Sequence, residues 1–198
     1  MKQHETEWIE RTLEARRQAI EPFAAYLGGG KSRISDVVET MLVVVKGQAG
    51  EAERAGGAPF SGKDGRALTQ AFERLGWGGD TWCGVLLEPH GRIESDSIDS
   101  GSIQPKPLGG ASLRFLLETL DPAVIVALDE TARKTLSDLY LSYGDSGVWH
   151  PGTIHDSSSC LLISVDGFES ALDSEVSKQR VWKQLKQASY ADVYKRLV

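Results

Sequence analysis

Four short apolar runs recur along the chain, separated by polar segments with helical spacing. Each run is rich in Val, Ile or Leu and lacks the alternation of apolar and polar residues seen in strands with one solvent-exposed face. Such continuous runs are typical of strands buried on both faces. The runs are residues 41–45, 82–87, 123–128 and 160–165. The pattern predicts four central strands.

Helical patterns lie between and after these runs. Residues 64–75 place Leu68, Phe72 and Leu75 on one face, and residues 112–120 begin with a capping serine and stop before a proline. Two more helical segments, 131–141 and 169–197, follow the third and fourth runs. Alternating strands and helices favour right-handed crossovers. We therefore predict an α/β fold: a three-layer α/β/α sandwich with a four-stranded, mainly parallel central sheet.

The N-terminal segment, about 5–27, has apolar residues at the spacing of an amphipathic helix. Pro22 predicts a kink or a break, and the glycines at 28–30 predict its end. No linker divides the remainder, so we expect residues 1–198 to form a single domain. Trp8 leaves two arrangements open for the helix, packing on its own domain or on a neighbour.

Composition narrows the classes of partner. The 198 residues carry a formal net charge of −6 and no basic run, which argues against a tight grip on a DNA backbone. No apolar stretch is long enough to span a bilayer, and the charged N-terminus shows no signal peptide, so a cytoplasmic protein without a membrane partner is expected. The oligomeric state is left open.

The two cysteines do not suggest special chemistry. Cys83 and Cys160 lie inside apolar runs, where a free cysteine usually behaves as a small core hydrophobe. His150, His155 and Asp156 cluster locally, but their spacing matches no recognised zinc pattern. We expect no metal site and no cofactor.

Parallel sheets bind ligands beyond the carboxyl ends of their strands. The informative positions are therefore 46–53, 88–92, 129–130 and 166–168. Asp129 follows the third run and precedes a helix, so helix N-capping accounts for it, with a ligand role as the alternative. Asp166 is in a similar place after the fourth run.

Two stretches resemble known sequences. Residues 43–51 (VVVKGQAGE) with 57–68 (GAPFSGKDGRAL) are similar to the first motif region of the uracil-DNA glycosylase superfamily, closest to bacterial branches that read roughly V-G-E-A-P-G. Residues 113–136 are similar to the helix, strand and following helix of that family. The resemblance implies the same fold and a nucleobase, nucleotide or DNA partner. It also implies a hydrolase of DNA repair, if the chain is active.

The positions that carry the chemistry of that family have changed. Gln48 stands where many members have Glu, and Ala49 stands where the best-known branch has Asp. Glu51 and Glu53 follow in the loop as candidate catalytic carboxylates. Asp166 occupies the place of a catalytic histidine, where its charge would repel an anionic leaving base. The resemblance therefore implies lost or reassigned base excision.

The candidate ligand-binding residues come from the same motif: Gly47, Gln48, Phe60 and Lys63. In the family, the phenylalanine at this place stacks on the flipped base; a buried ring under the loop is the alternative for Phe60. The four cysteines that hold an iron–sulfur cluster in one branch are absent. The Ser-, Asp- and Gly-rich stretch 88–110 is the longest irregular segment, a type of loop that is often functional.

Three hypotheses follow. The first is a glycosylase-like pseudo-enzyme that keeps a pocket for a nucleobase or nucleotide, with Gln48, Phe60 and Asp166 around one cavity. The second is an active divergent DNA glycosylase using Glu51 or Glu53, with His150 or His155 reaching the same place. The third is a non-catalytic interaction domain with plugged strand ends.

Overall fold

The computed structural model describes residues 2–30, 41–78, 81–88, 107–141, 149–157 and 159–197. Within these ranges the α-helices are α1 (Lys2–Ile20), α2 (Glu51–Arg54), α3 (Lys63–Arg74), α4 (Gly110–Leu120), α5 (Glu130–Tyr140), α6 (Phe168–Ala171), α7 (Glu175–Leu185) and α8 (Tyr190–Leu197). Two 3₁₀ helices are η1 (Glu21–Tyr26) and η3 (Lys186–Ala188). Most of the predicted loop 88–110 lies outside the described residues.

One six-stranded mixed sheet runs through the molecule. Its strands are β1 (Leu27–Gly28), β2 (Leu42–Lys46), β3 (Trp82–Leu86), β4 (Val124–Ala127), β5 (Ile154–Asp156) and β6 (Leu161–Ser164), in the order β1-β3-β2-β4-β6-β5. β3, β2, β4 and β6 are parallel, whereas β1 and β5 pair antiparallel to β3 and β6. The prediction of an α/β fold is confirmed and its four runs are the inner strands, but the four-stranded sheet is wrong because two short edge strands extend it.

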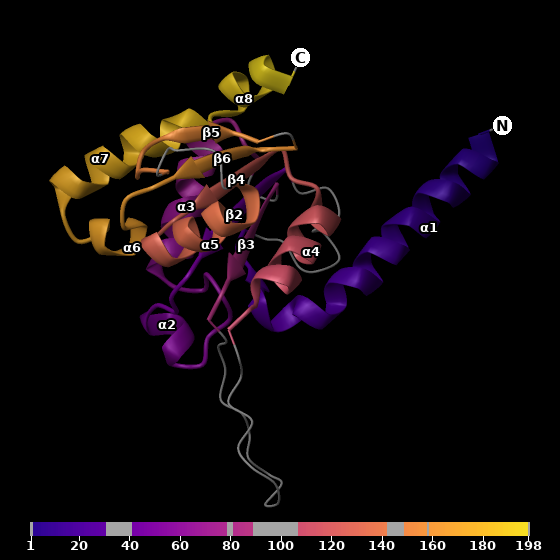
Figure 1. Ribbon diagram of the computed structural model, residues 1–198, viewed down its shortest axis with the longest axis horizontal. Coiled ribbons are helices and arrows are strands. Elements are labelled where there is room, and N and C mark those ends of the chain that lie inside the picture. The colour runs from indigo at the N-terminus through magenta and orange to yellow at the C-terminus, as the bar shows by residue number, and fades with distance from the viewer. Residues whose placement is uncertain are drawn as a thin grey trace, which may run out of the picture.

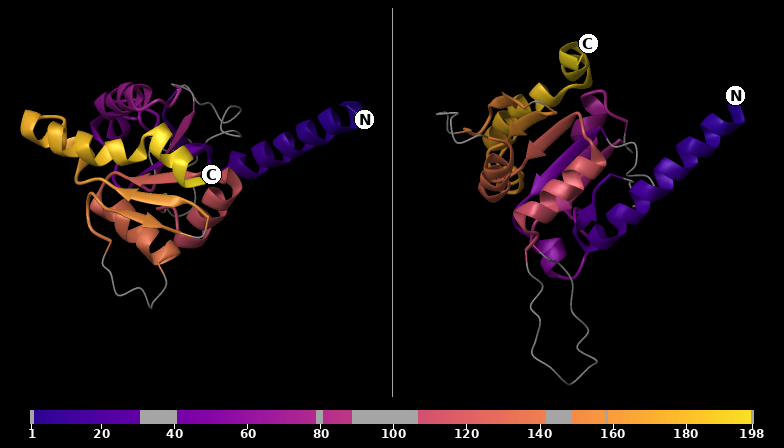
Figure 2. Two further views of the ribbon diagram at one scale, coloured as in Figure 1. Left: turned by 90° about the horizontal axis from the view of Figure 1, so that it is seen from above. Right: turned by 45° about the vertical axis from the view of Figure 1, so that its right-hand side comes forward.

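Alternate side chains of the inner strands supply two cores. On β2, Val43 and Val45 face a core shared with α4, α5 and the end of α1, whereas Leu42 and Val44 face a core shared with α3, α6, α7 and α8. Figure 2 shows helices on both sides of the sheet. Burial on both faces explains why the runs lack alternation.

Several helix boundaries differ from the prediction. α4 begins at Gly110, so Ser112 is not its N-cap, and the expected helix 169–197 is divided into α6, α7 and α8. The N-terminal helix does break at Pro22: α1 ends at Ile20, and Pro22 is the second residue of η1. The glycine segment that was expected only to end this helix instead enters the sheet as part of β1.

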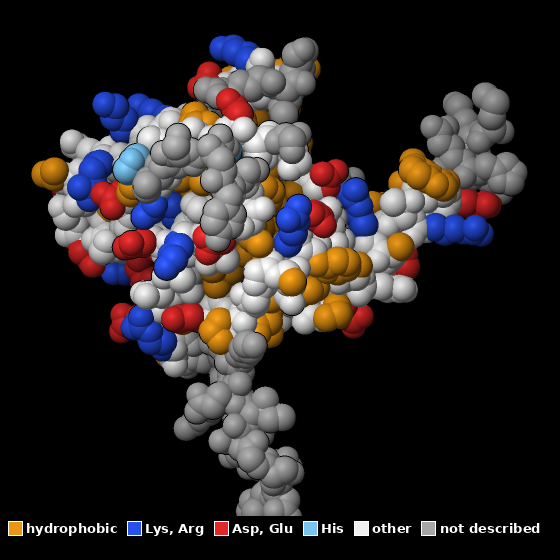
Figure 3. Space-filling view, viewed as in Figure 1, with side chains coloured by type: hydrophobic (Ala, Val, Ile, Leu, Met, Phe, Trp, Pro, Cys, Tyr) orange, Lys and Arg blue, Asp and Glu red, His pale blue; other side chains and the backbone are white. Residues whose placement is uncertain are grey.

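α1 extends away from the sheet-bearing body, and only its C-terminal part lies near the other helices (Figure 1). Basic and acidic side chains are interspersed on the face in Figure 3, which also shows hydrophobic side chains on the projecting helix and beside its base. No helix in the described part of the chain is long and apolar enough to cross a bilayer.

Candidate functional site

A cavity of about 350 Å³ lies beyond the carboxyl ends of β2, β4 and β6. The chain leaves β2 toward α3 on one face of the sheet and leaves β4 toward α5 on the other, so the two loops part there. Such a topological switch point is where open α/β sheets bind ligands. The lining residues are Lys46, Gln48, Ala49, Arg54, Lys63, Leu128, Asp129, Gly167, Phe168, Glu169, Ser170 and Asp173.

Asp129 joins the two diverging loops. Its carboxylate caps α5 by accepting the Ala132 amide (2.8 Å) and also accepts the Gly47 amide (2.7 Å) and the Gln48 amide (3.4 Å). A Cβ at Gly47 would collide with Thr131, so the glycine is needed for this close approach between loops. The predicted N-cap role of Asp129 is confirmed, and its second oxygen fixes the loop that bears Gln48.

Lys46, which lines the cavity, belongs to a buried ion cluster. The Lys46 ammonium, which ends β2, lies 2.8 Å from Glu53 and 2.5 Å from Asp64, and all three side chains are at most 3% exposed. Glu169, at the cavity, is 3.9 Å from the same nitrogen. Two carboxylates around one buried ammonium leave an excess of negative charge at this end of the sheet.

Glu53 is fully engaged in this cluster. Besides Lys46, its carboxylate accepts the backbone amides of Gly50 and Phe60, each at 2.9 Å. Burial opposes its ionisation, but the hydrogen bonds from Lys46 and the Phe60 amide outweigh burial and lower its pKa. A carboxylate with a lowered pKa and occupied lone pairs is a poor general base.

Lys46 is held as an ammonium for the same reason. Burial favours its neutral form, yet the hydrogen bonds to Asp64 and Glu53 outweigh burial and raise its pKa. The cation does not face the cavity as a free charge, because both buried carboxylates bind it.

These two shifts predict a pH window for stability. Glu53, with a folded pKa below its ordinary 4.5, stabilises the fold above pH 4.5 and loses its contribution as pH falls through the lowered value. Lys46, with a pKa above 10.5, contributes below pH 10.5 and loses its contribution as pH rises through the raised value. The difference in free energy of unfolding between the wild type and Glu53→Gln is therefore expected to be constant near neutrality and to shrink in acid. Urea titrations across pH measure it, and a difference that grows in acid would contradict this assignment.

Phe60 packs under the loop. Its backbone has φ of 59°, and its ring, only 5% exposed, meets Trp82 edge to face at 5.7 Å and lies 5.2 Å from the Lys46 nitrogen. Gly84 of β3 makes room for the ring, since a Cβ there would collide with it. Phe60 does not line the strand-end cavity, so this arrangement is the packed alternative and offers no face to a flipped base.

The structure separates the other predicted site residues. Gln48 and Lys63 line the cavity, with Lys63 paired to Asp173 at 2.9 Å across its mouth. Asp166 instead pairs with Arg180 at 3.3 Å, and neither it nor the exposed Glu51 lines the cavity. Gln48, Phe60 and Asp166 therefore do not surround one cavity. The first hypothesis drawn from the sequence required them to do so.

Sequence reasoning included Lys46 in a strand-end range without giving it a role, and it missed Glu169. Lys46 directly follows the apolar run 41–45, and a lysine that continues a buried strand must be paired, which is the signal that could have identified it. Glu169 lies just past the fourth strand, three residues beyond the position that the family motif pointed to.

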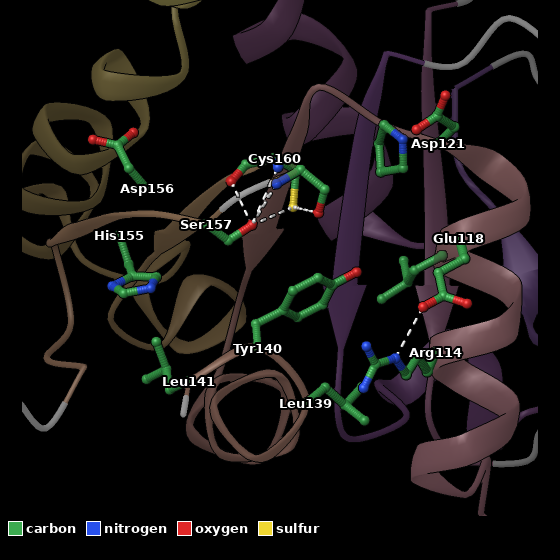
Figure 4. A pocket seen from close by; sticks show the side chains of 13 residues that line it. Arg114, Glu118, Asp121, Leu139, Tyr140, Leu141, His155, Asp156, Ser157 and Cys160 are labelled. Carbon is green, nitrogen blue, oxygen red and sulfur yellow. Dashed lines mark hydrogen bonds and ion pairs between the residues drawn. The ribbon is translucent and has the colours of Figure 1, made fainter. Parts of the chain in front are cut away.

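A second cavity, of about 750 Å³, lies at the opposite end of the sheet, where Pro122 and Cys160 precede β4 and β6. Figure 4 shows Tyr140 within it, with the ion pair of Arg114 and Glu118 on one side. Burial raises the pKa of Tyr140 to about 12 and also raises the pKa of the Cys160 thiol, so both keep their protons at neutral pH. These groups are not activated nucleophiles.

His150 and His155 do not reach the strand-end cavity. His155 lines the second cavity and His150 is exposed in the loop before β5. The described part of the chain holds no group of three or more His, Cys, Asp or Glu side chains that could bind a metal. Comparison with known proteins finds no matching family model and no matching curated protein.

Proposed function

We propose that the strand-end cavity binds a small, uncharged, polar heterocycle of nucleobase or nucleoside type, and that the chain does not excise bases. The observation that carries the proposal is the cavity itself, at the switch point of a parallel sheet, with Gln48 fixed at its edge through the loop contacts of Asp129. Its volume, about 350 Å³, lies in the range of small-ligand sites.

The lining matches the edge of a heterocycle. The Gln48 side-chain amide offers both a donor and an acceptor, the pairing by which glutamine reads a base. Glu169 adds an acceptor for a ligand N–H group, while Leu128 and Phe168 supply apolar surface. Alternating donors and acceptors beside an apolar floor suit a planar ring with N–H and C=O groups.

Charge argues against a phosphate in this cavity. The cavity is lined by three cations, Lys46, Arg54 and Lys63, and by three carboxylates, Asp129, Glu169 and Asp173. Two further carboxylates, Glu53 and Asp64, bind Lys46 in the interior and bring the local excess of negative charge. An anionic group brought there would meet net repulsion. A free base or nucleoside is therefore favoured over a nucleotide or a DNA backbone.

The same contacts support the absence of excision. Excision needs a carboxylate free to position water and a group that stabilises the departing anionic base. Glu53 is bound by three donors, and Lys46 is neutralised by two carboxylates. A departing base anion would also lie beside the Glu169 carboxylate.

Binding of uridine is expected to raise the melting temperature of the wild type, because a ligand that binds only the folded state stabilises it. Gln48→Ala is expected to weaken uridine binding about tenfold, through loss of the polar pairing between the Gln48 amide and the ligand, while Gln179→Ala on α7 leaves it unchanged. Isothermal titration with uridine measures the affinity of the wild type and of each variant. The same titration with uridine 5′-monophosphate measures the effect of a phosphate on binding. Equal affinity of wild type and Gln48→Ala, or tighter binding of the monophosphate, would contradict the proposed ligand class.

Excision is tested separately with single- and double-stranded oligonucleotides that carry one uracil, followed by alkaline cleavage of abasic sites. We expect no cleavage even with protein in excess. Cleavage that disappears in Glu51→Ala or Glu53→Gln would instead establish an active glycosylase that uses one of these carboxylates.

A further inference from the structure

α1 carries an apolar stripe that the described part of the chain covers at one end only. Ile9, Leu13 and Ile20 recur at helical spacing, with Trp8 beside Ile9. Ile20 is fully buried against the body and Leu13 is partly buried, but Ile9 is 46% exposed and Trp8 is 68% exposed. Among the residues that the structure describes, none covers the outward continuation of the face that holds the helix to the domain.

The base of the helix adds to this exposed surface. Phe115 of α4 is 51% exposed and its ring lies 6.2 Å from that of Phe23, which follows α1 in η1. Trp8, Ile9 and Phe115 are three of the large hydrophobic side chains that the described structure leaves exposed. Figure 3 shows hydrophobic side chains both on the projecting helix and beside its base. Exposed apolar surface of this kind often marks an interface.

The distribution of charge along α1 is complementary to that of a second, antiparallel copy of the same helix. Residues 2–10 hold three glutamates and one lysine, whereas residues 11–20 hold three arginines and one glutamate. Two copies of α1 laid antiparallel bring the acidic half of each against the basic half of the other. A parallel pair would place like charges together, which is unfavourable.

We propose that two copies of this chain form a dimer through antiparallel pairing of their α1 helices. An overlap centred near Thr12 brings Trp8 of each copy beside Arg16 of the other, an arrangement that suits a cation–π contact. The acidic tip of each helix then reaches the base of the other, near Phe23 and Phe115. The interface is isologous and closed, the commonest form of oligomer.

The first test is sedimentation equilibrium of the full chain over a wide concentration range. The mass is expected to rise from 21.6 kDa toward twice that value. The double substitution of Trp8→Ala and Ile9→Ala is expected to weaken association at least about tenfold, as for other interface anchors. Val176→Ala, which alters an α7 residue that is 79% exposed, is the matched control and should leave association unchanged.

The second test addresses charge and orientation. A chain with Glu5→Lys, Glu7→Lys and Glu10→Lys and a chain with Arg11→Glu, Arg16→Glu and Arg17→Glu are each expected to be monomeric alone and to dimerise when mixed. Under oxidising conditions Thr12→Cys is expected to form a covalent dimer and Ala19→Cys is not, because only position 12 lies near the two-fold axis. The native Cys83 and Cys160 are buried, so the wild type under the same oxidising conditions gives the background level of cross-linking.

Circular dichroism melts of each variant check folding, since none of these changes touches the sheet. A wild type that stays monomeric at the highest concentration would overturn the proposal. Undiminished association of the Trp8 and Ile9 variant, a monomeric mixture of the charge variants, or a covalent dimer of Ala19→Cys would do the same.

Discussion

Replacing Lys46 by methionine is expected to lower the free energy of unfolding at neutral pH by about 3–5 kcal/mol, the usual cost of leaving buried charge without its partner. The substitution would leave the carboxylates of Glu53 and Asp64 facing one another at the end of β2. Urea denaturation of the wild type and the variant measures the loss. Lys63→Met, at a surface ion pair, is the control and should have little effect.

Two further results separate charge from packing at this position. The loss in Lys46→Met is expected to diminish as pH falls, because burial without the Lys46 cation favours protonation of Glu53. Adding Glu53→Gln and Asp64→Asn to Lys46→Met should recover part of the stability, since neutral groups replace the unpaired charges. A loss that stays constant from neutral to acid pH would mean that the missing lysine side chain acts through packing alone.

Gly65→Ala is the second substitution with a large expected effect. Gly65 is in the first turn of α3, where helix propensity alone would give alanine an advantage of about 0.5–1 kcal/mol. A Cβ at this position would collide with the backbone carbonyl of Phe60, which is fixed in a left-handed conformation and cannot give way as a flexible side chain does. We therefore expect a net loss of about 1–3 kcal/mol.

Gly110→Ala is the matched control for that prediction. Gly110 also lies in the first turn of a helix, α4, and the nearest atom to an added Cβ is in the Leu139 side chain at 3.5 Å, an ordinary contact. The substitution should be neutral or stabilising, by at most about 1 kcal/mol. Thermal and urea unfolding measure the change in the free energy of unfolding for each variant. If the collision with the Phe60 carbonyl outweighs helix propensity, Gly65→Ala lowers this free energy and Gly110→Ala does not. A higher free energy of unfolding in Gly65→Ala would show that the loop of Phe60 moves freely.

The interior of the sheet could be predicted from the sequence, and its edges could not. Strands buried on both faces appear as continuous apolar runs, and all four inner strands begin and end within about two residues of those runs. β1 has only two residues and β5 reads Ile-His-Asp, so neither offers a pattern. Both edge strands form because an inner strand already presents its backbone groups to them.

The candidate site was harder to predict because its contacts join distant segments. Gln48 and Lys63 were predicted from the motif resemblance, Gln48 also lies in a predicted strand-end range, and both line the cavity. The partners of Lys46 lie 7 and 18 residues further along, and nothing local signals that they converge on it. The motif around Phe60 matched in residue type, yet the close packing at Gly84 turns the ring toward the sheet rather than toward the cavity.

We propose above that the cavity beyond β2, β4 and β6 is a ligand site for an uncharged heterocycle. The most direct measurement is a titration of isotopically labelled protein with uridine, followed by amide chemical shifts. We predict saturable shifts at residues 47–50, 128–129 and 167–170, with none around Tyr140 and Cys160 in the second cavity. Shifts confined to the second cavity, or no shifts with uridine in large excess, would contradict the account.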